Sequence, residues 1–193
     1  MYKEYSPCSV LAPFIYHFWE YKGETRSGLK FNIPPHGCSD FVFIVGNAAD
    51  CIKDSLIMKP YHSYFFGPMN TFTELVAHTN FIHIIGVRFR PCGLFQFIEI
   101  PLNELANQGI DSQEFPVLFS QSFIYQLCES NQNPIDIIEH ELVRQVYKNN
   151  MDTEKQISYA VSLISRQKGI VSIKELACLL YTSPSPRDPK TSR

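Results

Sequence analysis

Short runs of alternating aromatic, β-branched and polar residues fill the chain from position 14 to position 90. Side chains in a β-strand point alternately to the two faces of a sheet, so such runs predict half-buried strands. Turn formers such as Pro34-Pro35 and Gly67-Pro68 separate them. Many short strands with regular turns predict an antiparallel sandwich or barrel. The strands are expected at residues 14–21, 29–33, 40–45, 63–66, 72–78 and 81–90.

The hydrophobic period becomes helical after Pro91. Residues 93–99 suit a short helix or a strand, and Pro101 favours another helix start. Longer helices are predicted at 115–128 and 134–147. The second carries an apolar stripe made of Ile135, Ile138, Leu142 and Val146. This stripe serves either dimerisation or packing on the strands.

Two further amphipathic helices are predicted after the polar segment 148–152. Asp152 caps the first, and Gly169 ends it in a left-handed conformation. Ser172 and Glu175 form a capping box, which starts the second helix. Such a pair is the scaffold of a helix-turn-helix. The residues expected to face inward are Ile157, Ala160, Val161, Ile164, Ile173, Leu176 and Ala177.

A helix-turn-helix needs a third, amphipathic helix, whose N-terminal residues enter the major groove of DNA. After Tyr181 the chain has no aliphatic or aromatic residue, and prolines at 184, 186 and 189 each remove a backbone donor. We therefore expect the chain to lack the DNA-reading helix. Residues 178–188 resemble the translation of a transposase sequencing adapter, so 178–193 is expected to be a non-native, disordered tail. A genuine Ser- and Pro-rich terminus is the alternative.

Composition places the chain among globular proteins. Hydrophobic residues make up 45% and aromatic residues 13%, which is enough for a sizeable core. There are 17 Lys and Arg against 19 Asp and Glu. The tail holds Arg187, Lys190 and Arg193 against Asp188, so the remaining chain has 14 basic and 18 acidic residues, a net charge of −4. Any attraction for DNA must then come from the missing part.

Nothing in the sequence indicates a membrane or an oxidising compartment. No apolar stretch reaches the ~20 residues of a membrane helix, and the N-terminus lacks a signal-peptide pattern. We therefore expect a cytoplasmic protein without membrane contact. The cysteines before the tail, at 8, 38, 51, 92 and 128, are irregularly spaced and are interpreted as small buried side chains.

Several short motifs, in this order, resemble those of AraC-type transcriptional regulators. They are Tyr5-x-Pro7-x-x-x-Leu11-x-Pro13-x-Ile15 with Trp19, residues 35–43, Gly67-Pro68, residues 86–91 with Gly93, residues 101–105 and residues 171–177. The resemblance implies an α+β chain with an antiparallel, cupin-like β-barrel sensor domain, a helical linker and an incomplete helix-turn-helix. We expect these parts at 1–110, 111–150 and 151–177, followed by the tail 178–193.

A cupin-type fold can also carry a metal enzyme, for which a His-x-His pair on one strand is typical. Histidines at 17, 36, 62, 78, 83 and 140 include no such pair, and nucleophile, phosphate-loop and paired-carboxylate motifs are missing from the sequence. We therefore expect no catalytic residue, metal ligand or cofactor. A small cupin-type enzyme or a stand-alone effector-binding protein is the alternative, with ligands drawn from separate strands.

Four residues are candidates for binding an effector: Arg88, Arg90, Asp40 and Trp19. Arg88 and Arg90 share one face of a predicted strand and suit a bidentate grip on an anionic effector. Alternatively, they lie outward or pair with Asp40 or Glu74 as scaffold. Asp40 either accepts a hydrogen bond from the effector or braces its own turn. Trp19 lines either an apolar pocket or the ordinary core.

Together these features predict the sensor and linker fragment of an AraC-like regulator. A small effector, homodimerisation or both would control how the full-length protein binds promoter DNA. We expect the present chain not to bind DNA in a sequence-specific manner. If the tail is genuine, a truncated regulator that dimerises with a full-length copy and blocks it is a further alternative.

Overall fold

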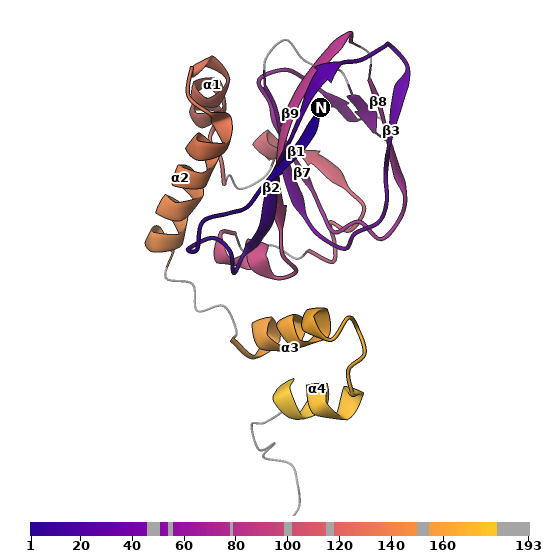
Figure 1. The fold of residues 1–193 in the computed structure, drawn as a ribbon, viewed down its shortest axis with the longest axis vertical. Helices are drawn as coiled ribbons and strands as arrows, with labels where there is room; N and C mark the ends of the chain where they lie inside the picture. Colours follow the sequence, from indigo (N-terminus) through magenta and orange to yellow (C-terminus); the bar gives the residue numbers. More distant parts are fainter. Residues whose placement is uncertain are drawn as a thin grey trace, which may run out of the picture. The chain divides into compact units, whose positions relative to one another are not determined.

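The alternating runs fold as two antiparallel sheets, drawn in Figure 1. The structure is a computed structural model that describes residues 1–45, 51–53, 56–77, 79–98, 102–114, 118–149 and 155–180. One sheet has six strands in the order β1-β2-β9-β4-β7-β10, and the other has four in the order β3-β8-β5-β6. The strands are β1 Tyr2–Tyr5, β2 Ile15–Glu24, β3 Leu29–Ile33, β4 Asp40–Ile44, β5 Cys51–Lys53, β6 Leu56–Met58, β7 Ser63–Phe66, β8 Thr73–Ala77, β9 Phe81–Phe89 and β10 Gly109–Asp111.

The strand pairing confirms the mixed α+β class with antiparallel sheets and corrects the expectation of a closed barrel. In a barrel, the last strand of the order must pair with the first. In the described part of the chain, the six-stranded sheet instead ends at β1 and β10, and the four-stranded sheet ends at β3 and β6. The two sheets therefore form an open sandwich.

Each of the six strands expected from alternation has a counterpart in the structure, and four short strands were missed. The missed strands β1, β5, β6 and β10 have only three or four residues. A run of three or four residues is too short to show an alternation of polar and apolar positions. Partners supply the pairing instead, as where Tyr2 lies opposite Tyr21 and Tyr5 opposite Phe18.

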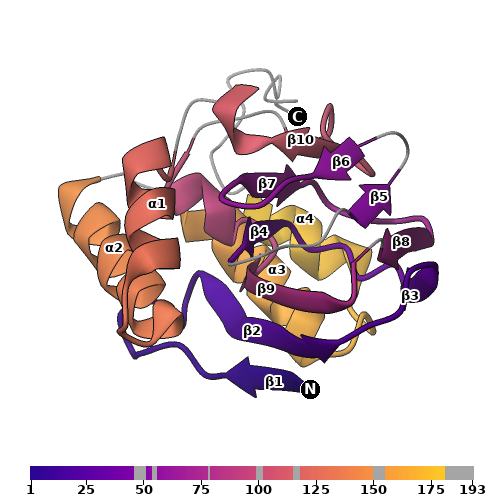
Figure 2. The same ribbon diagram turned by 90° about the horizontal axis from the view of Figure 1, so that it is seen from above.

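The six-stranded sheet separates two hydrophobic clusters, because successive side chains on a strand point to opposite faces. Phe41 and Val87 belong to the cluster on the helix side, whereas Val42 and Ile84 belong to the cluster between the sheets. Figure 2 shows the resulting layers, with α1 and α2 on one side of the six-stranded sheet and β3 and β8 on the other.

Helices α1 (Gln121–Glu129) and α2 (Pro134–Lys148) cover the helix-side cluster. The Ser120 side chain caps α1 by accepting from the Phe123 amide, and Asn133 caps α2 by accepting from the Ile135 amide. The expected stripe on α2 is buried at Ile135, Ile138 and Leu142. The stripe therefore packs on the strands of its own chain.

The helix expected to begin at Pro101 is not formed in the residues that follow it. Residues 102–107 run as turns, and the amides of Leu105 and Gln108 donate three residues back, to Leu102 and Leu105. A left-handed Asn107, with φ of 61°, ends the segment. Before it, η1 (Gly93–Gln96) is one short 3-10 helix. Pro101 itself and residues 115–117 of the next expected helix lie outside the described residues.

The chain divides after Met151, and the second unit contains α3 (Lys155–Arg166) and α4 (Ile173–Leu180). The turn after α3 is left-handed at the predicted Gly169, with a φ of 81°, and also at Lys168, with a φ of 52°; the Gly169 amide donates to the Ile164 carbonyl over 2.9 Å. Helix α4 begins directly after Ser172. It includes Cys178–Leu180, the first residues of the expected tail, whereas Asp152 and residues 181–193 lie outside the described part.

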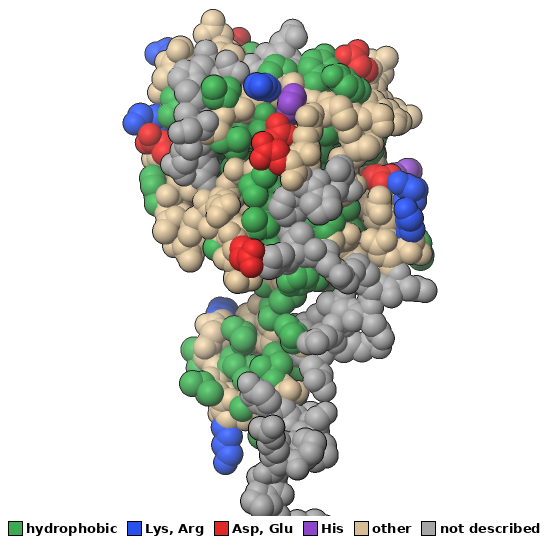
Figure 3. Space-filling view, turned by 180° about the vertical axis from the view of Figure 1, so that it is seen from behind, with side chains coloured by type: hydrophobic (Ala, Val, Ile, Leu, Met, Phe, Trp, Pro, Cys, Tyr) green, Lys and Arg blue, Asp and Glu red, His purple; other side chains and the backbone are tan. Residues whose placement is uncertain are grey.

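The apolar faces of α3 and α4 are only partly covered. Ala160 is buried, and Val161, Leu176 and Ala177 are half-buried, whereas Ser172 and Glu175 are exposed. Ile157, Ile164 and Ile173 are 42%, 39% and 83% exposed, so they do not face inward as expected. Figure 3 shows hydrophobic side chains at the surface of this unit. Two short helices cover each other on one side only, which leaves the rest of each apolar face in solvent. Among the described residues, no helix is long and apolar enough to cross a membrane.

Candidate functional site

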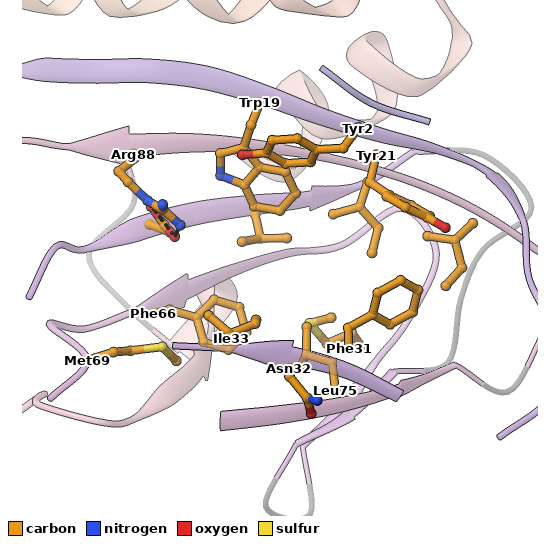
Figure 4. A pocket seen from close by; sticks show the side chains of 15 residues that line it. Tyr2, Trp19, Tyr21, Phe31, Asn32, Ile33, Phe66, Met69, Leu75 and Arg88 are labelled. Carbon is orange, nitrogen blue, oxygen red and sulfur yellow. Dashed lines mark hydrogen bonds and ion pairs between the residues drawn. The ribbon is translucent and has the colours of Figure 1, made fainter. Parts of the chain in front are cut away.

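A cavity of about 230 Å³ lies between the two sheets (Figure 4). Trp19, Tyr21 and Ile84 line it from the six-stranded sheet, and Phe31 and Leu75 line it from the four-stranded sheet. Most of its wall is therefore aromatic or aliphatic. A largely apolar cavity with few polar groups is typical of a small-molecule site.

The period of β2 places Trp19 in this cavity. Residues 17, 19 and 21 point to the face that looks at the second sheet, whereas Phe18 points into the helix-side cluster. Trp19 lies opposite Gly86 of β9. A β-carbon on Gly86 would stand 1.9 Å from Cε2 of the indole. Only glycine leaves room for the ring at this position.

Tyr2 of the edge strand β1 lies against the Trp19 ring. Their ring centroids are 6.2 Å apart, with 29° between the planes. The Tyr2 hydroxyl donates to Oε1 of Glu4 over 3.0 Å. Burial, together with this hydrogen bond and the charge of Glu4, raises the pKa of Tyr2 to about 12. The phenol is therefore a neutral part of the wall.

Arg88 and Asp40 form a bidentate ion pair at one end of the cavity. Nε of Arg88 donates to Oδ1 over 2.9 Å, and Nη2 donates to Oδ2 over 2.8 Å. The residues are cross-strand neighbours on β9 and β4, so both point to the same face. Burial lowers the pKa of Arg88, but the hydrogen bonds and charge of Asp40 outweigh it and raise the pKa. The Asp40 side chain is only 9% exposed.

Two histidines flank this ion pair. Nδ1 of His36 accepts from the Cys38 amide over 3.1 Å, so a neutral His36 carries its proton on Nε2, which is 3.7 Å from Oδ2 of Asp40. His17 lies opposite Arg88 on the neighbouring strand. Burial is the main cause that lowers the pKa of both imidazoles, so neutral rings are favoured.

Three buried nitrogen atoms near this end have no hydrogen-bond partner within the described residues. They are Nε1 of Trp19, Nε2 of His17 and Nε2 of His36. A buried polar atom without a partner is costly, and in native proteins it calls for a ligand, a water or an ion. Of the three residues, Trp19 lines the cavity.

The structure brings Asp40, Trp19 and Arg88 together but places Arg90 elsewhere. Nε of Arg90 donates to the Ala12 carbonyl over 2.8 Å, and its guanidinium lies 4.4 Å from the centroid of the Tyr16 ring. Strand β9 ends at Phe89, so the two-residue period does not extend to Arg90. The two arginines therefore do not form the bidentate anion site considered from the sequence. Glu74, the other partner considered, pairs instead with Lys30 at 2.9 Å.

Several cavity residues escaped sequence reasoning. Tyr2 belongs to a strand too short to show a period, and Phe31 comes from the other sheet. Gly86 gave a usable signal, because an isolated glycine inside a β-branched strand often marks a close approach. His36 follows two prolines in a loop, where no periodicity exists.

Few residues in the described part of the chain could bind a metal ion or act as a reactive thiol. No group of three His, Cys, Asp or Glu residues there could hold a metal ion. Cys8, Cys38, Cys92 and Cys178 are free thiols. Burial raises the pKa of the Cys38 thiol to about 11, which keeps this sulfur protonated and unreactive.

Fold and site together define an α+β domain in which two antiparallel sheets enclose a largely apolar cavity with one charged end. Residues 3–111 match a family described as a domain of unknown function, DUF6597, and the chain belongs to this family. Apart from Tyr2, the residues that line the cavity lie within the matched range. A comparison with curated proteins found no match.

Proposed function

We propose that the domain formed by residues 1–151 is the sensor of an AraC-like transcription regulator and that its cavity binds a small molecule. The observation that carries the proposal is the cavity, because its wall is largely apolar and includes Trp19, whose buried indole N–H has no acceptor among the described residues. A bound molecule would supply that acceptor and cover the apolar surface.

The regulatory part of the proposal rests on the order of motifs that resembles AraC-type regulators. In this proposal α3 and α4 begin a DNA-binding domain, which follows α1 and α2 of the sensor in the chain. The uncovered apolar residues Ile157, Ile164 and Ile173 support the proposal, since a further helix or a partner would cover them.

Two measurements test the two parts separately. Binding is followed by the fluorescence of Trp19, the single tryptophan of the chain, during titration with small apolar molecules. A saturable change is expected, and its absence across a broad panel would contradict the sensor role.

Regulation is tested by fusing residues 1–151 to a DNA-binding domain that needs dimerisation to occupy its operator. Expression of a reporter is expected to change with each molecule that perturbs Trp19 and to stay constant with the others. If reporter expression does not respond to any bound molecule, the domain is a stand-alone binding protein, which is the alternative drawn from the sequence.

A further inference from the structure

The cavity has one charged end, and the chemistry of that end restricts what can bind. Arg88 and Asp40 lie there, whereas Tyr21, Phe31 and Leu75 form part of the apolar remainder. A cavity on the order of 150 Å³ holds benzene. At about 230 Å³, this one suits a single substituted ring or two small fused rings.

The Trp19 indole supplies the first restriction. Its Nε1 is buried and has no hydrogen-bond partner in the described residues. In Figure 4 the nitrogen-bearing edge of the ring is turned toward Arg88. An indole nitrogen is a donor only, so the group that satisfies it must be an acceptor. A ligand without an acceptor would leave the desolvated N–H unpaired.

The Arg88–Asp40 pair supplies the second restriction. Asp40 already accepts hydrogen bonds from Nε and Nη2 of Arg88 and balances its charge. A ligand carboxylate drawn to Arg88 would lie beside the Asp40 carboxylate on the same guanidinium. Like charges repel strongly where solvent is scarce, and the Asp40 side chain is 9% exposed. The pair therefore disfavours an anionic ligand.

Building on the proposed sensor function, we propose that the ligand of this cavity is an uncharged aromatic molecule with a hydrogen-bond acceptor, such as a carbonyl oxygen, placed against Nε1 of Trp19. Its ring packs between the walls provided by Tyr21, Phe31 and Leu75. Trp19 sets the demand for an acceptor, and Asp40 sets the demand for neutrality. This differs from the anionic effector that two arginines on one strand suggest.

Three molecules of similar size and shape test this ligand class on the full chain: acetophenone, benzoate and cumene. They are a neutral acceptor, an anion and a hydrocarbon. We measure their affinities by Trp19 fluorescence and by calorimetry at pH 7. Acetophenone is expected to bind about fivefold more tightly than cumene, the worth of one hydrogen bond, and at least as much more tightly than benzoate. Benzoate binding as tightly as acetophenone would overturn the proposal.

Variants assign the two restrictions to their residues. Trp19→Phe keeps a ring but removes the donor, so calorimetry should show acetophenone losing about fivefold in affinity while cumene is unchanged. Asp40→Asn keeps the shape and removes the charge, so benzoate should gain roughly tenfold or more. Tyr125→Phe, which removes a polar group from an aromatic ring 53% exposed on α1, is the control and should change none of the affinities.

The outcomes separate the ligand class from the sensor function. If the three molecules bind equally well, or if Trp19→Phe weakens cumene as much as acetophenone, the ligand class is wrong and the sensor role stands. If none of them produces a fluorescence change or heat up to its solubility limit, the ligand class is wrong, and titration with the broad panel then decides whether the sensor role stands. If Asp40→Asn does not fold, the three affinities of the wild type and those of Trp19→Phe still test the ligand class.

Discussion

The indole ring of Trp19 lies over Gly86 on the neighbouring strand, so closely that a β-carbon there would stand 1.9 Å from Cε2. This contact fixes the ring that forms part of the cavity wall. The glycine is therefore a structural requirement of the cavity.

Gly86→Ala should destabilise the domain through this contact. The added methyl group must displace the indole or the backbone, and overpacking of this kind costs about 3 kcal/mol in free energy of unfolding. Urea unfolding measures the loss, and Trp19 fluorescence reports the displaced ring. In a Trp19→Ala background the same substitution should cost much less, as a double-mutant cycle would show. Equal costs in the two backgrounds would mean that the indole is not the obstacle.

The Arg88–Asp40 pair should matter far more than an exposed pair of the same length. Asp40→Ala leaves a poorly solvated guanidinium without its partner, which costs about 3 kcal/mol or more in free energy of unfolding. The matched control is Lys30→Ala, because Lys30 and Glu74 are 2.9 Å apart but 62% and 39% exposed. That change should cost less than about 1 kcal/mol. Similar losses for the two variants, measured by denaturant unfolding, would contradict this explanation.

The stability of the domain should fall on mild acidification. Burial lowers the pKa of His17 and His36 below the ordinary value of 6.5. Below pH 6.5 these histidines therefore bind protons in the unfolded chain. In the folded chain they bind protons only at a lower pH, below their lowered pKa. The free energy of unfolding is expected to be constant for these groups above pH 6.5 and to decrease below it.

Denaturant unfolding between pH 5 and pH 8 measures this slope. A variant with both His17→Gln and His36→Gln should show a flatter profile than the wild type. An unchanged slope in the double variant would show that other groups cause the acid sensitivity.

Residues 1–151 should fold without the rest of the chain. The two hydrophobic clusters of the sandwich and its helices take their residues from this range. A truncation after Met151 is expected to keep the thermal midpoint and the Trp19 emission of the full chain. A truncation after Glu129 removes α2 with its buried Ile135, Ile138 and Leu142, and it should not fold. Loss of structure in the fragment of residues 1–151 would show that residues after Met151 are needed.

Local patterns predicted the elements whose signal is contained in their own residues. The six longer alternating runs became strands, and the helix predicted at 134–147 formed as α2. Gly169 marked the end of the α3 segment because a positive φ there suits glycine. Pro101 misled, since a favourable first position does not make a helix when the amides that follow bond three residues back.

By itself, the sequence determined the alternation, the caps and the charge, and with them the mixture of antiparallel strands and helices and three of the residues that meet at the cavity, Asp40, Trp19 and Arg88. Only the tertiary structure decided that the sheets stay open, that Asp40 neutralises Arg88, and that Arg90 leaves the cavity to lie over Tyr16. The physical reason is that alternation tells which face of a strand a residue occupies but not which strand lies beside it. Pairing between strands that are distant in the sequence determines which strand is adjacent. The side chains of that strand then determine the charge of the site and which of its polar groups lack a hydrogen-bond partner.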